Sequence, residues 1–580
     1  MVKKLMKSIR DQKWNSILAM VTITGEVVME VVIPLIMANM IDLGIDAGNM
    51  GMIIKMGIFL ALAALGQLVF GVVSGRFAAV ASTGFARNLR HDMFHKVQTF
   101  SFSNIDKFST ASIITRLTAD VSHLQNTYQM IIRMAIRSPL MSVFAFIAAF
   151  SIDKKLSLIF IAFIPILVAG LMLIMRKTHP IFERVFKKTD RLNNVVQENL
   201  HGVRVVKSFV REDFEEKKFT TASAEIANDF IRAEYNLAWN GPLMQICMYG
   251  TTLLLSWFGA RAIVACGGDA ALGLSTGELL SLISYSGQIL GSLMGLSMIF
   301  VMLTMSRAAG KRIVEILDEQ SDILSPENAQ TEVKDGSIDF ENVQFSYHKK
   351  AGKPVLDNIN LHIPSGATIG IIGGTGSSKS SLVQLIPRLY DVQQGCVKVG
   401  GTDVRAYDLD ALREEVSVVL QKNVLFSGTI KDNLRWGNEN ATDEEMIHAC
   451  KLAQADEFIS AFPDGYDTYI EQGGTNVSGG QKQRLCIARA LLKKPKILIL
   501  DDSTSAVDTR TDALIREAFA TEIPNTTKII IAQRIASVQE SDMIIVLDDG
   551  KIMACGTHDE LIKTSDIYRE VFESQTKGDE

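Results

Sequence analysis

Long apolar runs alternate with polar stretches through the first half of the chain. Mainly apolar residues occupy six runs, at positions 15–41, 52–80, 138–152, 156–175, 243–266 and 279–305. A helix of about 20 apolar residues crosses the roughly 30 Å hydrocarbon layer of a membrane, and the third run reaches that length only with its flanks. The pattern predicts six membrane-spanning helices.

Basic residues concentrate in the stretches that follow the second and fourth runs. Twelve Lys and Arg residues lie between Arg176 and Arg232. Those after the second run are Arg87, Arg90, Lys96, Lys107, Arg116, Arg133 and Arg137. Positively charged loops stay in the cytoplasm, so both stretches and both chain ends are predicted to be cytoplasmic, with Lys154 and Lys155 as a weak contrary signal. We expect a multi-pass protein of the cell membrane, in a bacterium the plasma membrane.

Both basic stretches keep helical periodicity and contain few Gly or Pro residues. They are predicted to continue the spans as long helices into the cytoplasm, because structureless loops of that length are uncommon. Short polar stretches at 115–123 and 209–219 mark their far ends. We expect these two tips to contact the soluble half of the chain; solvated hairpin tips are the alternative.

Two glutamates lie inside the first apolar run. Glu26 and Glu30 are spaced i and i+4, which places both on one helix face near the middle of the membrane. A charge there costs about 2.5 kcal/mol or more, so such residues usually face a wet cavity. The hypothesis is a cation or proton site in a substrate cavity. The alternative is a pair of neutral carboxyl groups, hydrogen bonded between helices without substrate contact.

Composition and charge separate two halves. The 580 residues are 47% hydrophobic, and the mean hydropathy of +0.19 excludes a disordered or fibrous chain. Residues 1–320 carry 32 Lys and Arg against 24 Asp and Glu, and residues 321–580 carry 27 against 40. The basic half is the apolar one, which suits an anionic membrane surface and not nucleic acid. Six scattered cysteines without a CxxC pair indicate neither a disulfide framework nor a zinc site.

From Gly336 onward, short β-branched strands alternate with helices, as in an α/β domain. A strand at 368–372 leads into a glycine-rich loop and a helix. The loop is Gly373-Gly374-Thr375-Gly376-Ser377-Ser378-Lys379-Ser380-Ser381. In such a P-loop, backbone N–H groups surround phosphates, Lys379 reaches the β and γ oxygens, and Ser380 offers a hydroxyl to Mg²⁺. Ser378 stands where the pattern has glycine.

Two further segments complete a nucleotide site. A strand at 496–500 ends in Asp501 and Asp502, where a carboxylate can hold Mg²⁺. Between this strand and the P-loop lies Ser478-Gly479-Gly480-Gln481, which opens a helix whose N-terminus can face phosphate. These patterns predict a transmembrane domain over 1–320, a linker over 321–335 and a nucleotide-binding domain over 336–580.

The P-loop, the Ser-Gly-Gly-Gln signature and the Asp-ended strand, in this order, resemble the ATPase domain of an ATP-binding cassette transporter. With six spans ahead of it, the whole chain is similar to a half-transporter of the exporter type, in the multidrug and lipid export group. The implied fold is a six-helix transmembrane domain with long cytoplasmic helical extensions, followed by an α/β P-loop ATPase domain.

This resemblance implies ATP and Mg²⁺ as cofactors and assigns further residues. Tyr347 matches the aromatic residue that stacks on adenine, and Gln421 matches the glutamine that touches Mg²⁺ and relays to the membrane half. Asp508, in Ser505-Ala506-Val507-Asp508, matches the loop that crosses to the partner. The two cytoplasmic tips match the coupling helices. The implied partners are a second half-transporter, the lipid bilayer and an amphipathic small molecule, and no nucleic acid.

Two residues depart from the pattern at the centre of the chemistry. The resemblance implies a glutamate as the base and a histidine at the γ-phosphate, but the chain has Asp502 and Gln533. A base out of hydrogen-bond reach forfeits roughly 10²–10⁴ in rate, and glutamine cannot become a cation. The signature is intact except for Val477. The chain therefore resembles the degenerate-site subunit of a heterodimeric bacterial multidrug exporter. Glu471-Gln472-Gly473-Gly474, before the signature, is a further departure.

The sequence is also compatible with two other functions. A nucleotide-gated channel or regulatory subunit would use ATP occupancy without pumping. A homodimeric lipid or peptide exporter is the third possibility, and the peptide version is less favoured because no peptidase domain precedes the spans. The 24 methionines suit an adaptable drug cavity as well as ordinary lipid-facing positions.

Overall fold

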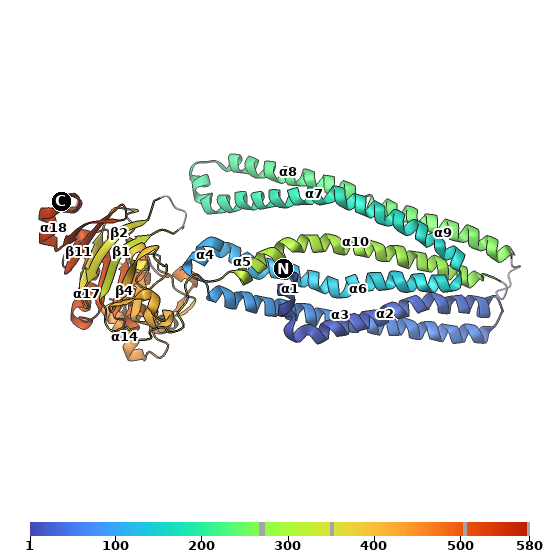
Figure 1. The fold of residues 1–580 in the computed structure, drawn as a ribbon, viewed down its shortest axis with the longest axis horizontal. Coiled ribbons are helices and arrows are strands. Elements are labelled where there is room, and N and C mark those ends of the chain that lie inside the picture. Colours follow the sequence, from blue (N-terminus) through green and yellow to red (C-terminus); the bar gives the residue numbers. More distant parts are fainter. Residues whose placement is uncertain (266–272, 348–352, 503–506, 577–580) are drawn as a thin grey trace. The chain divides into compact units, whose positions relative to one another are not determined.

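The computed structural model describes residues 1–265, 273–347, 353–502 and 507–576. They form two compact units (Figure 1). The first comprises Met1–Gln98 and Thr110–Glu319, and the second comprises Thr99–Ser109 and Gln320–Glu580. Each unit is described by itself.

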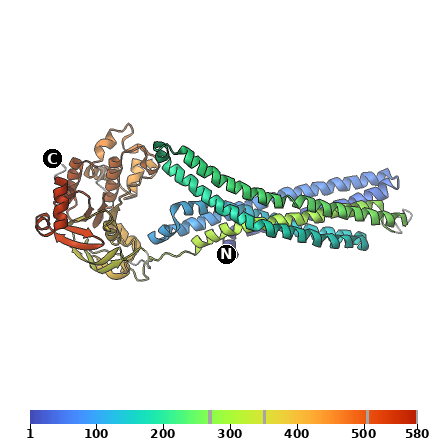
Figure 2. The ribbon, with the colours of Figure 1, turned by 90° about the horizontal axis from the view of Figure 1, so that it is seen from above.

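The first unit is helical. Its long helices are α2 (Lys13–Met40), α3 (Met50–Gln98), α6 (Val121–Ile152), α7 (Lys154–Ser208), α8 (Glu212–Leu237), α9 (Asn240–Ala265) and α10 (Thr276–Asp318). Among the described residues, six helical segments are long and apolar enough to cross a membrane, which confirms the six predicted spans. With 55 residues, α7 is about 80 Å long, more than twice the hydrocarbon thickness. The predicted helical extensions are therefore present, and α7 and α8 run side by side (Figures 1 and 2).

Short elements connect the long helices. They are α1 (Val2–Leu5), the 3₁₀ segment η1 (Met6–Gln12), the π-helical turns η2 (Ile41–Ile45) and η3 (Arg116–Asp120), and α5 (Thr110–Thr115). The short helix α4 (Phe102–Phe108) follows α3 in sequence but belongs to the second unit. Buried Asp120 accepts two hydrogen bonds from the Arg312 guanidinium, at 2.5 and 2.7 Å. Such a bidentate pair fixes the relative orientation of the two side chains. It ties the start of α6 to α10.

Helices α2 and α10 approach closely at one end. The Asp42 carboxylate accepts hydrogen bonds from the Ser275 hydroxyl (2.5 Å) and the Gly277 N–H (2.8 Å), at the N-terminus of α10. A Cβ on Gly277 would lie 2.4 Å from the carbonyl oxygen of Ala38, so only glycine fits there. Further along, the small residues Ala19, Ala78 and Ala81 let α2 and α3 pack tightly.

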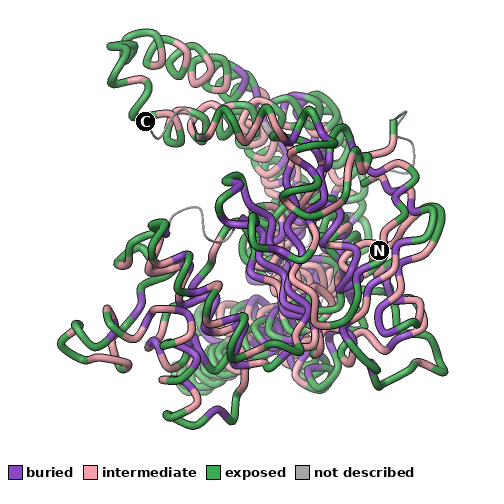
Figure 3. The backbone as a smooth tube through the Cα atoms, turned by 90° about the vertical axis from the view of Figure 1, so that its left-hand side faces the viewer, coloured by how far each residue is buried: buried purple, intermediate pink, exposed green. Residues whose placement is uncertain are grey.

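The second unit contains a six-stranded sheet in the order β12-β11-β3-β10-β9-β6. The strands are β3 (Thr368–Ile372), β6 (Val416–Val419), β9 (Ile497–Asp501), β10 (Thr527–Ile531), β11 (Met543–Asp548) and β12 (Lys551–Gly556). All neighbours are parallel except β11 and β12. Every residue of β9 and β10 is buried, as expected for strands covered on both faces. Figure 3 shows the backbone coloured by burial.

A smaller antiparallel sheet has the order β2-β1-β4-β5, formed by β1 (Ile338–Phe345), β2 (Leu356–Ile363), β4 (Gln394–Val399) and β5 (Thr402–Asp403). A short pair, β7 (Gly428–Thr429) and β8 (Tyr469–Ile470), lies apart from both sheets. The helices are α11 (Lys379–Gln384), α12 (Leu409–Glu415), α13 (Ile430–Arg435), α14 (Asp443–Leu452), α15 (Asp456–Ser460), α16 (Gly479–Leu492), α17 (Thr509–Glu522), α18 (His558–Thr564) and α19 (Asp566–Thr576). Two apolar clusters, one containing Leu498 and Leu500 and the other Ile497 and Ile499, pack on opposite faces of β9.

Candidate functional site

The predicted site residues follow four neighbouring parallel strands. The P-loop follows β3, Gln533 follows β10, and Gln421 follows β6. Asp501 is the last residue of β9, and Asp502 comes directly after it. These strands are adjacent in the order β3-β10-β9-β6. Because the carboxyl ends of parallel strands meet at one edge of a sheet, the topology brings these residues together.

The P-loop wraps around its lysine. The Lys379 ammonium donates to the carbonyl oxygens of Gly373 (2.7 Å) and Gly374 (2.8 Å), and lies 3.2 Å from the Ser377 hydroxyl. Burial lowers the pKa of Lys379, and the charges of Asp501 and Asp502 oppose that shift. A cation surrounded by main chain in this way is placed to meet phosphate oxygens.

The glycines of the P-loop serve different purposes. A Cβ on Gly373 would lie 2.1 Å from the Leu547 carbonyl oxygen, so the turn requires glycine for close packing. Gly374 has open space around its Cα, and Gly374, Thr375 and Gly376 are exposed. The loop therefore presents main chain, and little side chain, to its surroundings.

Ser378 adopts a left-handed backbone conformation, with φ 74° and ψ 22°. This conformation costs a residue with a Cβ about 1–2 kcal/mol relative to glycine. Ser378, which replaces a glycine of the P-loop pattern, is thus a locally strained residue immediately before Lys379. The loop still closes around the lysine, and Ser377 behind it is buried.

The side-chain oxygens of Ser380 and Asp501, the two predicted Mg²⁺ ligands, lie side by side. The Ser380 hydroxyl donates to Asp501 Oδ1 at 3.0 Å, and Asp501 is buried. Burial raises the pKa of Asp501, Asp502 adds to the rise, and the Ser380 hydrogen bond and Lys379 oppose it. Hydroxyl and carboxylate oxygens suit Mg²⁺, which takes one or two protein ligands beside phosphates and water. The residues present therefore fit an Mg²⁺–nucleotide complex.

Asp502 is held by two glutamines. Its Oδ2 accepts a hydrogen bond from Gln533 Nε2 at 2.8 Å, and Gln421 Nε2 lies 3.5 Å from the same oxygen. The Asp502 backbone has φ 49°, and its N–H donates to the Ile531 carbonyl oxygen. The structure thus brings together the two residues that depart from the pattern.

Tyr347 lies beside the helix that follows the P-loop. Its hydroxyl is 2.9 Å from the Ser381 hydroxyl, and its ring meets the Tyr390 ring edge to face at 5.1 Å. Tyr390 in turn donates a hydrogen bond to Asp106 on α4, at 2.8 Å. Tyr347 as a residue is 42% exposed, which leaves surface for stacking. The sequence did not predict Tyr390 or Asp106 as part of this site, because no short-range pattern marks a contact between such distant positions.

The signature residues cap their own helix. The Gln481 N–H donates to the Ser478 hydroxyl (3.2 Å), and the Ser478 N–H donates to Gln481 Oε1 (2.9 Å). This capping box starts α16 and leaves Gly479 and Gly480 in its first turn, where N–H groups lack partners within the helix. The start of α16 is therefore an anion-attracting surface, separate in its hydrogen bonds from the P-loop group.

Asp508 caps α17 by accepting the Thr511 N–H at 2.9 Å. That hydrogen bond lowers the pKa of Asp508. Ser505 and Ala506, predicted to precede it in the crossing loop, lie outside the described residues.

In the first unit, Glu26 and Glu30 face an arginine. Arg137 on α6 lies 2.5 Å from Glu30 Oε2 and 3.7 Å from Glu26 Oε1. Glu26 packs against Gly71: a Cβ added to this glycine would lie 3.5 Å from the Glu26 carboxyl group. The prediction that Arg137 is a cation of a cytoplasmic loop is wrong, because Arg137 lies within the helix bundle, paired with glutamates of the first span.

Of the two predicted tips, 115–123 covers the end of α5, the turn η3 and the start of α6. The second tip, 209–219, covers the turn after α7 and the first two turns of α8. At the second tip, the side chains of Phe209, Val210 and Phe214 are 73%, 81% and 61% exposed. Val210 has φ 50°, an unusual conformation for a β-branched residue. The second tip, at the end of α7 and the start of α8, thus presents apolar side chains outward.

A P-loop domain with this strand order, joined to six membrane spans, defines the class of nucleotide-driven membrane transporters. Residues 16–293 match the ABC transporter transmembrane region, and residues 356–505 match the ABC transporter domain. The chain is 36% identical over 561 residues to YfiB, an uncharacterized ABC transporter ATP-binding protein of Bacillus subtilis (strain 168), with 96% of each chain covered. It is 34% identical over 550 residues to the uncharacterized ABC transporter ATP-binding protein Rv1273c of Mycobacterium tuberculosis (strain ATCC 25618 / H37Rv), covering 94% and 93%.

The chain belongs to the ABC transporter family. Its fold matches the structure of a bacterial Atm1-family ABC exporter with ATP bound, with a TM-score of 0.81 at 23% identity over 98% of each chain. It therefore has the fold of an exporter-type half-transporter. It is a multi-pass membrane protein with a cytoplasmic ATPase domain.

Proposed function

We propose that this chain is one half of a heterodimeric ATP-driven exporter of amphipathic compounds, drugs or lipids, in which its own P-loop site binds ATP but hydrolyses it slowly. The observation that carries the proposal is the contact between Asp502 and Gln533. At this place an acid with a short side chain accepts a hydrogen bond from a neutral amide, at 2.8 Å.

The physical argument concerns reach and charge. An aspartate carboxylate ends about 1.5 Å short of a glutamate carboxylate from the same backbone position, because one methylene is missing. A general base must come within about 3 Å of the attacking water, and a base displaced from it loses rate. Gln533 donates hydrogen bonds but cannot supply a positive charge near a γ-phosphate. Both differences weaken hydrolysis while leaving Lys379 and Ser380 free to bind nucleotide.

The proposal has a second part: the signature of this chain completes the ATP site of the partner chain. Ser478 and Gln481 preform the start of α16, so the N–H groups of its first turn are available to a nucleotide held by another chain. A partner with a true glutamate and histidine would then have a competent site, completed by this chain. Asp508, exposed at the start of α17, belongs to the same facing surface in this proposal.

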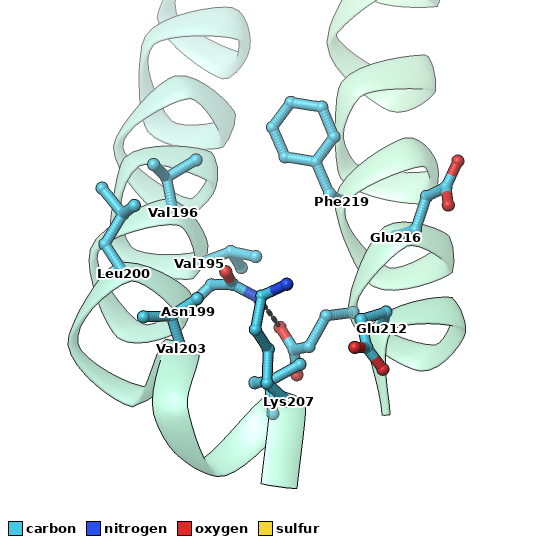
Figure 4. Close-up of a pocket in the computed structure, with 11 residues that line it drawn as sticks. Val195, Val196, Asn199, Leu200, Val203, Lys207, Glu212, Glu216 and Phe219 are labelled. Carbon is cyan, nitrogen blue, oxygen red and sulfur yellow. Dashed lines mark hydrogen bonds between the residues drawn. The ribbon is translucent and has the colours of Figure 1, made fainter. Parts of the chain in front are cut away.

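Two exposed apolar surfaces support the proposal that the tip at 209–219 docks on a nucleotide-binding domain. Near the tip with Phe209 and Phe214, an open hollow of about 400 Å³ lies between α7 and α8, lined by residues such as Val196, Leu200 and Phe219 (Figure 4). The second unit carries an apolar patch just after Gln421, formed by Val424, Phe426 and Trp436, with the last two rings stacked at 4.3 Å. Apolar groups of this size are normally covered in a working assembly. We assign the tip to docking on a nucleotide-binding domain, and the patch to receiving a tip.

The charges inside the first unit support a site for neutral or cationic amphipathic compounds. Two carboxylates face one guanidinium, so the group of Glu26, Glu30 and Arg137 carries one excess negative charge when all three are ionised. Glu26 Oε2 is buried without a hydrogen-bond partner. Alternating access, driven by ATP binding and reset by hydrolysis at the partner's site, would expose such a group to each side in turn.

The decisive experiment replaces Asp502 and Gln533 with the glutamate and histidine of the family pattern. The purified chain should hydrolyse ATP slowly, and the variant Asp502→Glu with Gln533→His should hydrolyse it at least tenfold faster. Adding Lys379→Ala to that variant should abolish the gain, which assigns the activity to this P-loop. Brisk turnover by the unchanged chain, or no gain in the double variant, would contradict the proposal.

A further inference from the structure

The C-terminal helix α19 contacts the segment that carries Gln533. Gln575 Nε2 donates to the Gln533 carbonyl oxygen at 2.8 Å, and Gln575 Oε1 accepts the Ile535 N–H at 2.9 Å. One side-chain amide thus holds two backbone groups on either side of Arg534. These hydrogen bonds lie just beyond β10, where the strand ladder has ended, so they replace the pairing that a neighbouring strand would supply.

Helix α19 is itself firmly attached to the second unit. Tyr568 is fully buried, and its hydroxyl is 2.7 Å from His558 Nδ1 on α18. Val571 and Phe572 pack against the apolar cluster that contains Ile535. Because both ends of the contact belong to the same packed cluster, the position of Gln575 is set by the core and not by a loose tail.

The side chain of Gln533 extends from this held backbone to the nucleotide site. Its Nε2 donates to Asp502, so a continuous path of hydrogen bonds runs from Gln575 through Gln533 to Asp502. A glutamine side chain has three rotatable bonds, and its terminal amide is well placed only when the backbone that carries it is fixed.

We infer that Gln575 is a positioning residue of the nucleotide site, which holds the main chain of Gln533 so that the Gln533 amide is presented beside Asp502 to the terminal phosphate. This inference rests on the proposed function, since it assumes that the P-loop site binds ATP. It adds a residue from the far C-terminal helix to a site whose predicted residues lie between Tyr347 and Gln533.

The test measures the affinity of the full chain, in lipid nanodiscs, for a fluorescent ATP analogue with Mg²⁺. Gln575→Ala should weaken binding about three- to tenfold, the range expected when hydrogen bonds that place a ligand-binding group are lost. Ser574→Ala is the matched control, an exposed neighbour on the same helix, and should leave the affinity unchanged. Melting temperatures without nucleotide show whether either variant changes the fold.

A double-mutant cycle separates positioning from a merely structural role. In a Gln533→Ala background, Gln575→Ala should change the affinity less than twofold, because the side chain through which Gln575 acts is gone. Equal weakening in both backgrounds would overturn the inference, and so would equal affinities of Gln575→Ala and Ser574→Ala. Gln575→Glu keeps an acceptor for the Ile535 N–H but loses the donor, so it should fold like the unchanged chain and bind as weakly as Gln575→Ala.

Lys379→Ala distinguishes this inference from the proposed function. If the unchanged chain binds the analogue and Lys379→Ala abolishes binding, nucleotide binding by the P-loop stands, and the Gln575 variants alone decide the inference. If the unchanged chain does not bind the analogue, both the inference and the proposed function are overturned.

Discussion

Tyr390 donates a hydrogen bond to Asp106, and the two residues lie 284 positions apart in the chain. Asp106 belongs to α4, which lies between the second and third spans in sequence but packs within the second unit. Burial raises the pKa of Tyr390, so its phenol stays protonated and donates. The ring of Tyr390 also touches Tyr347, the predicted adenine-stacking residue, and Phe102 on α4. One side chain of the second unit therefore contacts both the predicted base site and α4, the segment that the chain inserts between two spans.

This contact predicts a separation of nucleotide binding from transport. Tyr390→Phe keeps the ring contacts with Tyr347 but removes the hydrogen bond to Asp106, so ATP affinity should change less than twofold. ATP-driven transport by the assembled pair should fall several-fold, because α4 is less firmly held. Transport and nucleotide affinity are measured on the same preparation in proteoliposomes. Tyr469→Phe, an exposed tyrosine of the same unit, is the control, and equal transport by the two variants would contradict the prediction.

The left-handed conformation of Ser378 predicts that glycine is better tolerated than serine at this position. Ser378→Gly should raise stability by about 0.5–1 kcal/mol, since relief of the strained φ exceeds the added freedom of the unfolded chain. Ser378→Ala keeps the Cβ and should give no gain. Thermal unfolding of the full chain measures both variants. Equal melting temperatures would show that Ser378 is not strained.

The raised pKa of Asp501 predicts a pH dependence of Mg²⁺ binding. Because burial raises this pKa above its usual value of 3.8, the carboxylate takes up a proton at higher pH than an exposed aspartate. The gain in nucleotide affinity caused by Mg²⁺ should therefore decline as pH falls toward that raised pKa. Binding titrations with Mg²⁺ and with EDTA, across mildly acidic to neutral pH, measure the gain.

The same shift has a consequence for stability. Between 3.8 and the raised pKa, the folded protein binds more protons at Asp501 than the unfolded chain does, so stability contributed by this group falls as pH rises. Asp501→Asn should flatten both the pH dependence of stability in that window and the effect of Mg²⁺. A Mg²⁺ effect that survives in Asp501→Asn would contradict the assignment of this ligand.

The ion pairs of Arg137 predict a large effect of removing the cation. Arg137→Gln leaves Glu26 and Glu30 facing each other without compensation, which should lower stability by about 2–4 kcal/mol. Adding Glu30→Gln should recover much of that loss, because the remaining carboxyl group then has no charged neighbour. Arg261→Gln, an exposed arginine on α9, is the control. Melting temperatures in one detergent compare the variants, and a failure of Glu30→Gln to rescue would exclude the charge explanation.

The sequence predicted much of the fold because its signals are local. Six apolar runs and the helical periodicity between them are properties of neighbouring residues, and the structure confirms the spans and their long extensions. The P-loop could be located because strand, turn and helix are consecutive in the chain. Short motifs are enough to single out Asp502 and Gln533. Their contact, however, arises because β9 and β10 are neighbouring strands.

Sequence alone determined which residue types stand at the spans, the P-loop and the signature, since hydrophobic length and short-range spacing are written directly in the chain. Only the tertiary structure decided which distant groups meet. Arg137 pairs with Glu30 across 107 positions, Tyr390 meets Asp106, and Gln575 reaches the backbone of Gln533. Such contacts depend on helix packing and strand order, which arise from the burial of many side chains at once, so no spacing rule along the chain encodes them.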